Sequence, residues 1–137
     1  MKDTIKEIES YLADYFKNGS MKHINELLDI QDKIAIHSYR LAEMCADAKN
    51  TYNGAYFIRK VEVNRKMQAM IGKGMSKAAS QVEAESSQEG AELSKNELET
   101  EAEAYKLDLL LGQVNRVLHS LSQRISYLKN EQPKHQG

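Results

Sequence analysis

The chain has 137 residues and a net charge of -1; 28% of its residues are charged, 7% are aromatic and none is Trp. This length fits one domain, and the composition is typical of long exposed helices more than of a compact enzyme core. The balanced charge excludes a uniformly basic nucleic-acid binder, although it does not tell how the charges are distributed. We therefore expect an all-α protein that associates with itself.

The cysteine content and the apolar runs indicate where the protein acts. Cys45 is the single cysteine, so the chain cannot form an internal disulfide, and no apolar leader precedes the first expected helix. We therefore expect a cytoplasmic protein. No apolar run approaches the ~20 residues that span a bilayer, so no membrane partner is expected.

Two helices are predicted in the first half of the chain. A Thr-x-x-Glu capping box at 4–7 predicts a short helix over 4–18. Apolar residues then recur every three or four positions and predict a long helix over 21–72, which the glycines of 72–74 end. The Asn-Gly turn dipeptide at 53–54 leaves a kink or a short strand open there.

The second half is predicted to begin with a connector and to continue as a helix. Ser, Ala, Gln and Glu dominate 73–93 and large apolar side chains are almost missing, so this segment is predicted to be a mobile acidic connector. A Ser-x-x-Glu capping box at 94–97 and regularly spaced leucines predict a long helix over 95–130. Pro133 lies in a polar tail over 131–137 and cannot continue this helix.

These elements predict a single helical domain over 1–137, formed by a short N-terminal helix and a long antiparallel helical hairpin with coiled-coil character. Such a hairpin exposes apolar side chains on its far side. We expect Phe57, Ile58 and Val61 to project there, and another copy of the chain is their simplest cover. The protein is therefore predicted to be a homo-oligomer with these three residues at the interface.

The charges are strongly segregated along the chain. Residues 49–77 contain seven basic side chains against one glutamate, whereas 78–104 contain eight glutamates against one lysine. Basic side chains meet phosphates, and aromatic rings stack on unpaired bases, so the basic block predicts contacts with single-stranded DNA. The candidate phosphate contacts are Lys49, Arg59, Lys60, Arg65 and Lys66, and the candidate stacking rings are Tyr52 and Tyr56.

Other interpretations of the same blocks stay open. The basic and acidic blocks could lie side by side and neutralise each other in solvated pairs, each contributing only ~0.2 to 1 kcal/mol. The basic block could instead bind an acidic protein. In a third hypothesis the acidic connector covers the basic face until DNA displaces it.

The sequence contains no recognisable catalytic chemistry. His23, His37, His119 and His135 are scattered, and the sequence has no second cysteine beside Cys45, so no metal site is predicted. Phosphate-binding loops, dinucleotide fingerprints and nucleophile motifs are also missing. We therefore expect neither an enzyme nor a bound cofactor.

The order of these parts resembles the small recombination mediator proteins of tailed phages, the T4-type family that loads a recombinase onto single-stranded DNA. The resemblance lies in the basic and aromatic stretch from Tyr52 to Lys66, the glycine-marked break after it, and a Ser-Lys-Asn-Glu helix start at 94–97 that leads into Leu107 to Leu128. It implies a ring-like oligomer that binds single strands, displaces a single-strand-binding protein and helps a recombinase assemble.

The sequence therefore favours an oligomeric single-stranded DNA binding accessory protein of recombination or replication, of phage or mobile-element type. Its partners would be further copies of itself, single-stranded DNA, and a recombinase or single-strand-binding protein. The alternative is a helical-hairpin protein-interaction module, such as a virion scaffold, an assembly chaperone or an inhibitor of a host defence complex. In that case the apolar outer face would carry the function.

Overall fold

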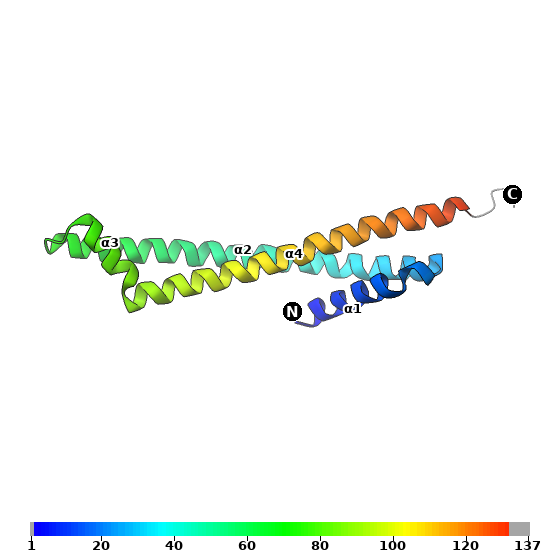
Figure 1. Cartoon of the computed structure of the whole chain (residues 1–137), viewed down its shortest axis with the longest axis horizontal. Helices are drawn as coiled ribbons and strands as arrows, with labels where there is room; N and C mark the ends of the chain where they lie inside the picture. The colour runs from blue at the N-terminus through cyan, green and yellow to red at the C-terminus, as the bar shows by residue number, and fades with distance from the viewer. Residues whose placement is uncertain (1, 132–137) are drawn as a thin grey trace. The chain divides into compact units, whose positions relative to one another are not determined.

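A computed structural model describes residues 2–131 of the chain, and it is all-α, as the sequence predicted (Figure 1). No strand occurs within this range. The predicted polar tail, with Pro133, lies outside the described residues except for its first position, which is helical. The elements in chain order are α1 (Lys2–Asn18), the 3-10 helix η1 (Gly19–Met21), α2 (Ile24–Gly72), α3 (Lys77–Ser86) and α4 (Gln88–Glu131).

The chain divides into two compact units. The terminal unit contains Met1–Cys45 and Leu107–Gly137, and the middle unit contains Ala46–Lys106. Each of the two long helices contributes one segment to each unit. The sequence had indicated one helical domain, and the boundaries between the units fall inside α2 and α4 instead of at a loop.

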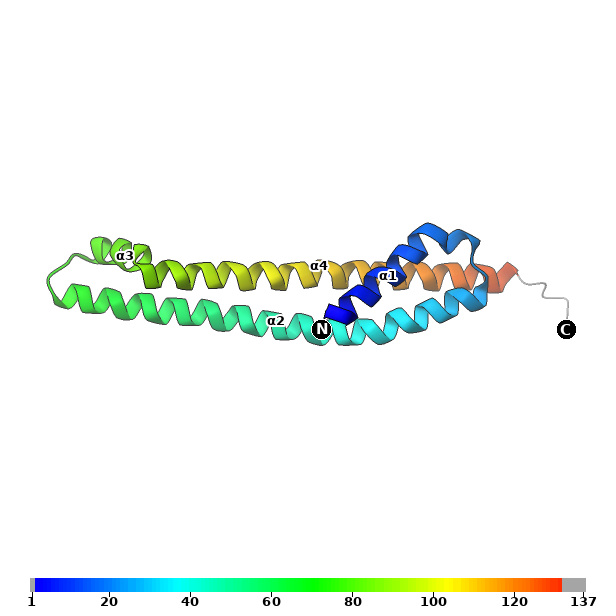
Figure 2. The same ribbon diagram turned by 90° about the horizontal axis from the view of Figure 1, so that it is seen from below.

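In the terminal unit, α1 packs on segments of both long helices (Figure 2). The Tyr15 hydroxyl is 2.7 Å from Ser120 Oγ of α4, and Arg124 Nη2 donates to the Ser20 carbonyl oxygen at 3.2 Å. The hydrophobic effect of burying the aliphatic residues between these helices holds the unit together. The most completely buried of them are Ile8, Leu27, Ile34, Leu41, Val114 and Leu121.

The long helix α2 ends where the sequence predicted it to end. Gly74 has a φ of 98°, in the region that favours glycine, and Met75 N–H donates to the Met70 carbonyl at 3.1 Å. At the turn dipeptide Asn53-Gly54, α2 continues without a break and no strand forms. Burial of Ala55 and Val63 on the inner side of this helix outweighs the local turn preference.

The segment 73–93, predicted to be a mobile acidic connector without a packed element, contains α3 and the first residues of α4 and is mostly helical. Ser76 Oγ accepts a hydrogen bond from Ala79 N–H at 3.2 Å and caps α3. On its inner side α3 buries Ser80 and Ala84. The sequence analysis looked for large apolar side chains, whereas this short helix packs through small ones that allow its backbone to approach closely.

The start of α4 also differs from the prediction. Ser87 Oγ accepts a hydrogen bond from Gly90 N–H at 3.1 Å and caps the helix, so the predicted capping box at 94–97 lies well inside α4. A Cβ atom at Gly90 would lie 2.2 Å from the Ala84 carbonyl oxygen, so only glycine fits at the turn between α3 and α4. At the N-terminal side, α1 begins at Lys2, before its predicted capping box. The helix α2 begins at Ile24, after η1 and the two residues that follow it.

Candidate nucleic-acid interface

The seam of the middle unit, the line along which its α2 and α4 segments face each other, is unusually polar. On α4 the least exposed positions are spaced by steps of four and three, which is the spacing of inward positions in a coiled coil. Two of these positions are polar, Glu97 and Thr100, and on α2 the polar Arg59 lies between Ala55 and Val63. The inward positions in order are Tyr52, Ala55, Arg59 and Val63 on α2, and Leu93, Glu97, Thr100 and Ala104 on α4.

Arg59 forms a two-point ion pair with Glu97 in this seam. Its Nε donates to Glu97 Oε2, and its Nη2 donates to Glu97 Oε1 at 3.4 Å. Both side chains are largely buried. The hydrogen bond to Glu97 raises the pKa of Arg59 above its ordinary value. Arg59, a candidate phosphate contact, is thus engaged by a carboxylate of α4.

Two further candidate phosphate contacts also have acidic neighbours. Lys66 Nζ is 2.8 Å from Glu89 Oε2 and 3.3 Å from Ser87 Oγ at the start of α4. The hydrogen bond from Lys66 lowers the pKa of Glu89. Arg65 is exposed and is paired with Glu62 of its own helix. Arg59 and Lys66 thus pair with glutamates of the acidic block, whereas Arg65 pairs within the basic block.

The two candidate stacking rings lie in different environments. The Tyr56 ring is 37% exposed and has two cations next to it: Lys60 Nζ is 4.8 Å from the ring centroid and the Arg59 guanidinium carbon 5.6 Å. Tyr52 is less exposed and lies in the seam, where burial and, after it, the charges of Glu101 and Glu97 raise its pKa. Of the two rings, Tyr56 is the one close to an exposed cationic group, that of Lys60.

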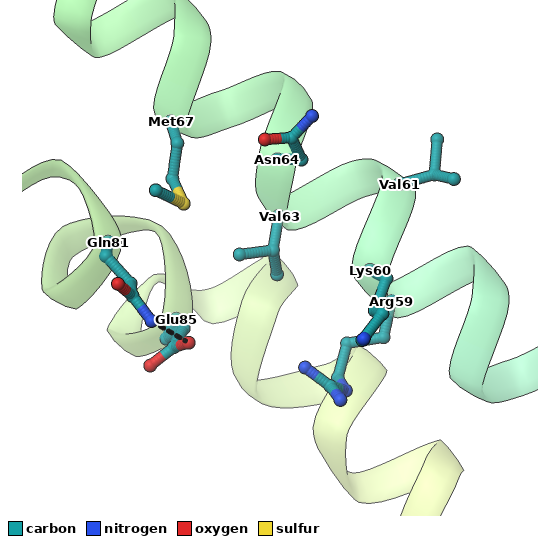
Figure 3. A pocket seen from close by; sticks show the side chains of 8 residues that line it. All are labelled: Arg59, Lys60, Val61, Val63, Asn64, Met67, Gln81 and Glu85. Carbon is teal, nitrogen blue, oxygen red and sulfur yellow. Dashed lines mark hydrogen bonds between the residues drawn. The ribbon is translucent and has the colours of Figure 1, made fainter. Parts of the chain in front are cut away.

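A hollow of about 430 Å³ lies between α2 and α3 (Figure 3). Val63 and Met67 of α2 point toward Gln81 and Glu85 of α3. Gln81 Nε2 donates to Glu85 Oε1 at 3.3 Å. The hollow could not be predicted from the sequence, because one of its two walls is α3 and no packed helix was expected there. The residues that line it are Arg59, Lys60, Val61, Val63, Asn64, Met67, Gln81 and Glu85.

The outer side of α2 presents the apolar residues that the sequence placed at an oligomer interface. Phe57, Ile58 and Val61 are 67%, 53% and 45% exposed. A helix rotates by about 100° per residue, so Phe57 and Val61 lie on the side opposite to Arg59 and the seam. The structure therefore places these three residues on a separate side of the helix from the ion pair.

A second exposed apolar surface lies on α4 and was not found from the sequence. Leu98 and Tyr105 are 65% and 66% exposed and are spaced by seven residues, two turns of the same helical side. Glu97, the neighbour of Leu98 in sequence, takes the inward position and turns Leu98 outward.

Lys49 is exposed on α2, and it is the remaining candidate phosphate contact. Within residues 2–131, no three His, Cys, Asp or Glu side chains gather closely enough to hold a metal ion. In the same range, none of the helices has a stretch apolar and long enough to cross a bilayer. Comparisons with protein-family models, with curated proteins and with solved structures found no match for this chain.

Proposed function

We propose that this protein is an oligomeric single-stranded DNA binding accessory protein of recombination or replication, of phage or mobile-element type. In this proposal it acts in the cytoplasm, α2 and α4 form an antiparallel hairpin, and several copies assemble. A recombinase or a single-strand-binding protein is its proposed protein partner. The observation that carries the proposal is the exposed Tyr56 ring with Lys60 and Arg59 beside it.

The chemistry of this surface suits a single strand without a sequence preference. Every base has a face that can stack on an aromatic ring, and stacking contributes about 1 to 3 kcal/mol per base. Lys60 Nζ lies close enough to Tyr56 to contact the phosphate of a base stacked there. Exposed Lys49 lies two helical turns before Tyr56 and extends the line of cations along α2.

The paired cations fit the same proposal in a second step. Lys66 is bound to Glu89, whose side chain is about half exposed, so a phosphate can replace that carboxylate at small cost. Arg59 is bound to the more buried Glu97, and its release would require the seam to open. We therefore assign Lys60 and Tyr56 to the first contact with DNA and Lys66 to a contact that follows.

Fluorescence anisotropy of a labelled oligo-dT strand tests the proposal. The variant Tyr56→Ala/Lys60→Ala is expected to bind at least tenfold more weakly than the wild type, because one stacking ring and one cation are lost. The control is Lys95→Ala/Lys106→Ala, which removes two cations from α4. Equal affinities for the two variants, or no binding by the wild type at low salt, would reject DNA binding through this surface.

A second candidate function has its own support. If Arg59, Lys66 and Arg65 serve only to pair with glutamates, the middle unit has no net basic surface, and the exposed apolar residues become its main feature. The protein would then be an interaction module, such as a scaffold, an assembly chaperone or an inhibitor of a defence complex. Binding that persists in high salt, to a protein and not to DNA, would favour this function.

A further inference from the structure

The middle unit has two exposed apolar surfaces that face away from its seam. The first, the α2 surface, consists of Phe57, Ile58 and Val61. The second, the α4 surface, consists of Leu98 and Tyr105. Clusters of large apolar side chains that remain about half exposed or more often mark a binding surface. Neither surface is covered by any other described part of the chain.

The net charges next to the two surfaces have opposite signs. Lys60 lies about 60° of helical rotation from Phe57 on one side, and Arg65 lies about 40° from Val61 on the other side, where it is paired with Glu62. Glu99 and Glu101 are the acidic residues next to Leu98 in sequence, and both are exposed. Lys95 also lies near Leu98, and it is 3.9 Å from Glu99. The α2 surface is thus bordered by two basic side chains and Glu62, and the α4 surface by three acidic side chains and two lysines, Lys95 and Lys106. The net charge is therefore positive beside the first surface and negative beside the second.

Gly54 adds an observation that packing within the chain does not explain. It lies in the interior of α2, one turn before Phe57 and Ile58, where glycine is less favourable than alanine. A Cβ atom there would meet nothing within 4 Å. Inside this chain nothing requires a glycine, whereas a large side chain from another molecule that packs beside Phe57 would use the space.

We propose that the α2 surface of one copy binds the α4 surface of the next copy. The apolar residues of the two surfaces would cover each other, Lys60 and Arg65 would face Glu99 and Glu101, and Tyr105 or Leu98 of the second copy would lie over Gly54. The two surfaces in such a contact are different, so a pair of bound copies leaves one surface of each kind open, and the assembly grows into a ring or a filament. This inference rests on the oligomeric part of the proposed function.

Two variants separate this contact from others. Phe57→Asp/Val61→Asp changes only the α2 surface and places acidic groups opposite Glu99 and Glu101. Leu98→Lys/Tyr105→Lys changes only the α4 surface and places basic groups opposite Lys60 and Arg65. The control, Ile36→Asp/Tyr39→Asp, makes the same kind of change at two exposed apolar residues of α2 in the terminal unit. Circular dichroism checks that all variants keep the wild-type helix content.

Light scattering coupled to size-exclusion chromatography gives the mass of each species. The wild type and the control are expected to be oligomers of the same mass, and each surface variant is expected to be a monomer. An equimolar mixture of the two surface variants is expected to form a dimer with one copy of each, because one intact α2 surface then meets one intact α4 surface. This dimer cannot grow, since its remaining surfaces are the altered ones.

Several results would overturn the inference. They are a monomeric wild type, an α4-surface variant with the wild-type mass, a control that also dissociates, and a mixture that stays monomeric. DNA binding is measured separately, by anisotropy on the monomeric variants, which retain Tyr56 and Lys60. Retained DNA binding with an unchanged oligomer mass in the α4-surface variant would reject this contact and leave the proposed DNA binding intact.

Discussion

Arg59 and Glu97 are 38 residues apart in the sequence and form a two-point ion pair across the seam of the middle unit. Both lie at positions where a coiled coil ordinarily has apolar residues. An ion pair at such a position fixes the register of the two helix segments, because any shift leaves two largely buried charges unpaired. The same pair occupies the guanidinium group of Arg59, which is therefore not available to bind a phosphate while the pair is intact.

Removing one partner of this pair is expected to destabilise the protein more than removing both. Arg59→Leu leaves Glu97 unpaired in the seam and is expected to lower the free energy of unfolding by about 1 to 3 kcal/mol. Arg59→Leu/Glu97→Leu leaves no charge there and is expected to recover most of this loss. Urea unfolding of the two variants and of Glu97→Leu, followed by circular dichroism, measures the coupling. Additive losses would show that the two side chains do not interact.

The turn between α3 and α4 is expected to tolerate no side chain at Gly90. Gly90→Ala would place a methyl group 2.2 Å from the Ala84 carbonyl oxygen, so α3 must move, and we expect a loss of about 1 to 3 kcal/mol. Gly112→Ala in the same helix is the control, since the nearest atom to its Cβ is Arg116 Nη1 at 3.8 Å. There alanine is expected to be neutral or to stabilise by up to about 1 kcal/mol. Thermal unfolding measures the melting temperatures of both variants, and we expect Gly90→Ala to melt at the lower temperature. Equal melting temperatures would contradict the close approach at Gly90.

The contact between Lys66 and Glu89 is expected to weaken in acid. The hydrogen bond from Lys66 lowers the pKa of Glu89 below its ordinary value of 4.5, so the unfolded chain takes up this proton at a higher pH than the folded one. The stabilisation is therefore complete above the ordinary value and is lost as the pH falls through the lower, folded value. The melting temperature of Glu89→Gln should decrease less than that of the wild type between about pH 7 and about pH 3. The control is Glu92→Gln, which makes the same charge change and leaves the contact between Lys66 and Glu89 in place.

The acidic residues around α3 are expected to compete with DNA for the basic side chains. In Glu89→Gln the Lys66 side chain loses its carboxylate partner, so oligo-dT should bind more tightly, by a factor of about two to five. Anisotropy measures the affinity, with Glu92→Gln as the control of equal charge change. An unchanged affinity in Glu89→Gln alone would show that Lys66 makes no contact with DNA.

Much of the helical fold could be predicted from the sequence, because the spacing of apolar residues and the glycines of 72–74 are local signals. The helix α3 could not, since it packs through Ser80 and Ala84, whose small side chains do not form an apolar pattern. The charge blocks indicated that basic and acidic groups could pair, but not that Arg59 meets Glu97. The seven-residue spacing of Leu93, Thr100 and Leu107 was the signal that could have placed Glu97 inward.

The most direct test of DNA binding is the affinity of the wild-type protein for oligo-dT as a function of salt. Contacts between cations and phosphates release counterions, so the logarithm of the association constant should fall linearly with the logarithm of the salt concentration, with a slope of about -0.7 for each phosphate contact on a single strand. For Lys49, Lys60 and Lys66 acting together, the account predicts a slope of about -2. Absence of binding at about 50 mM salt, or an affinity that does not depend on salt, would contradict it.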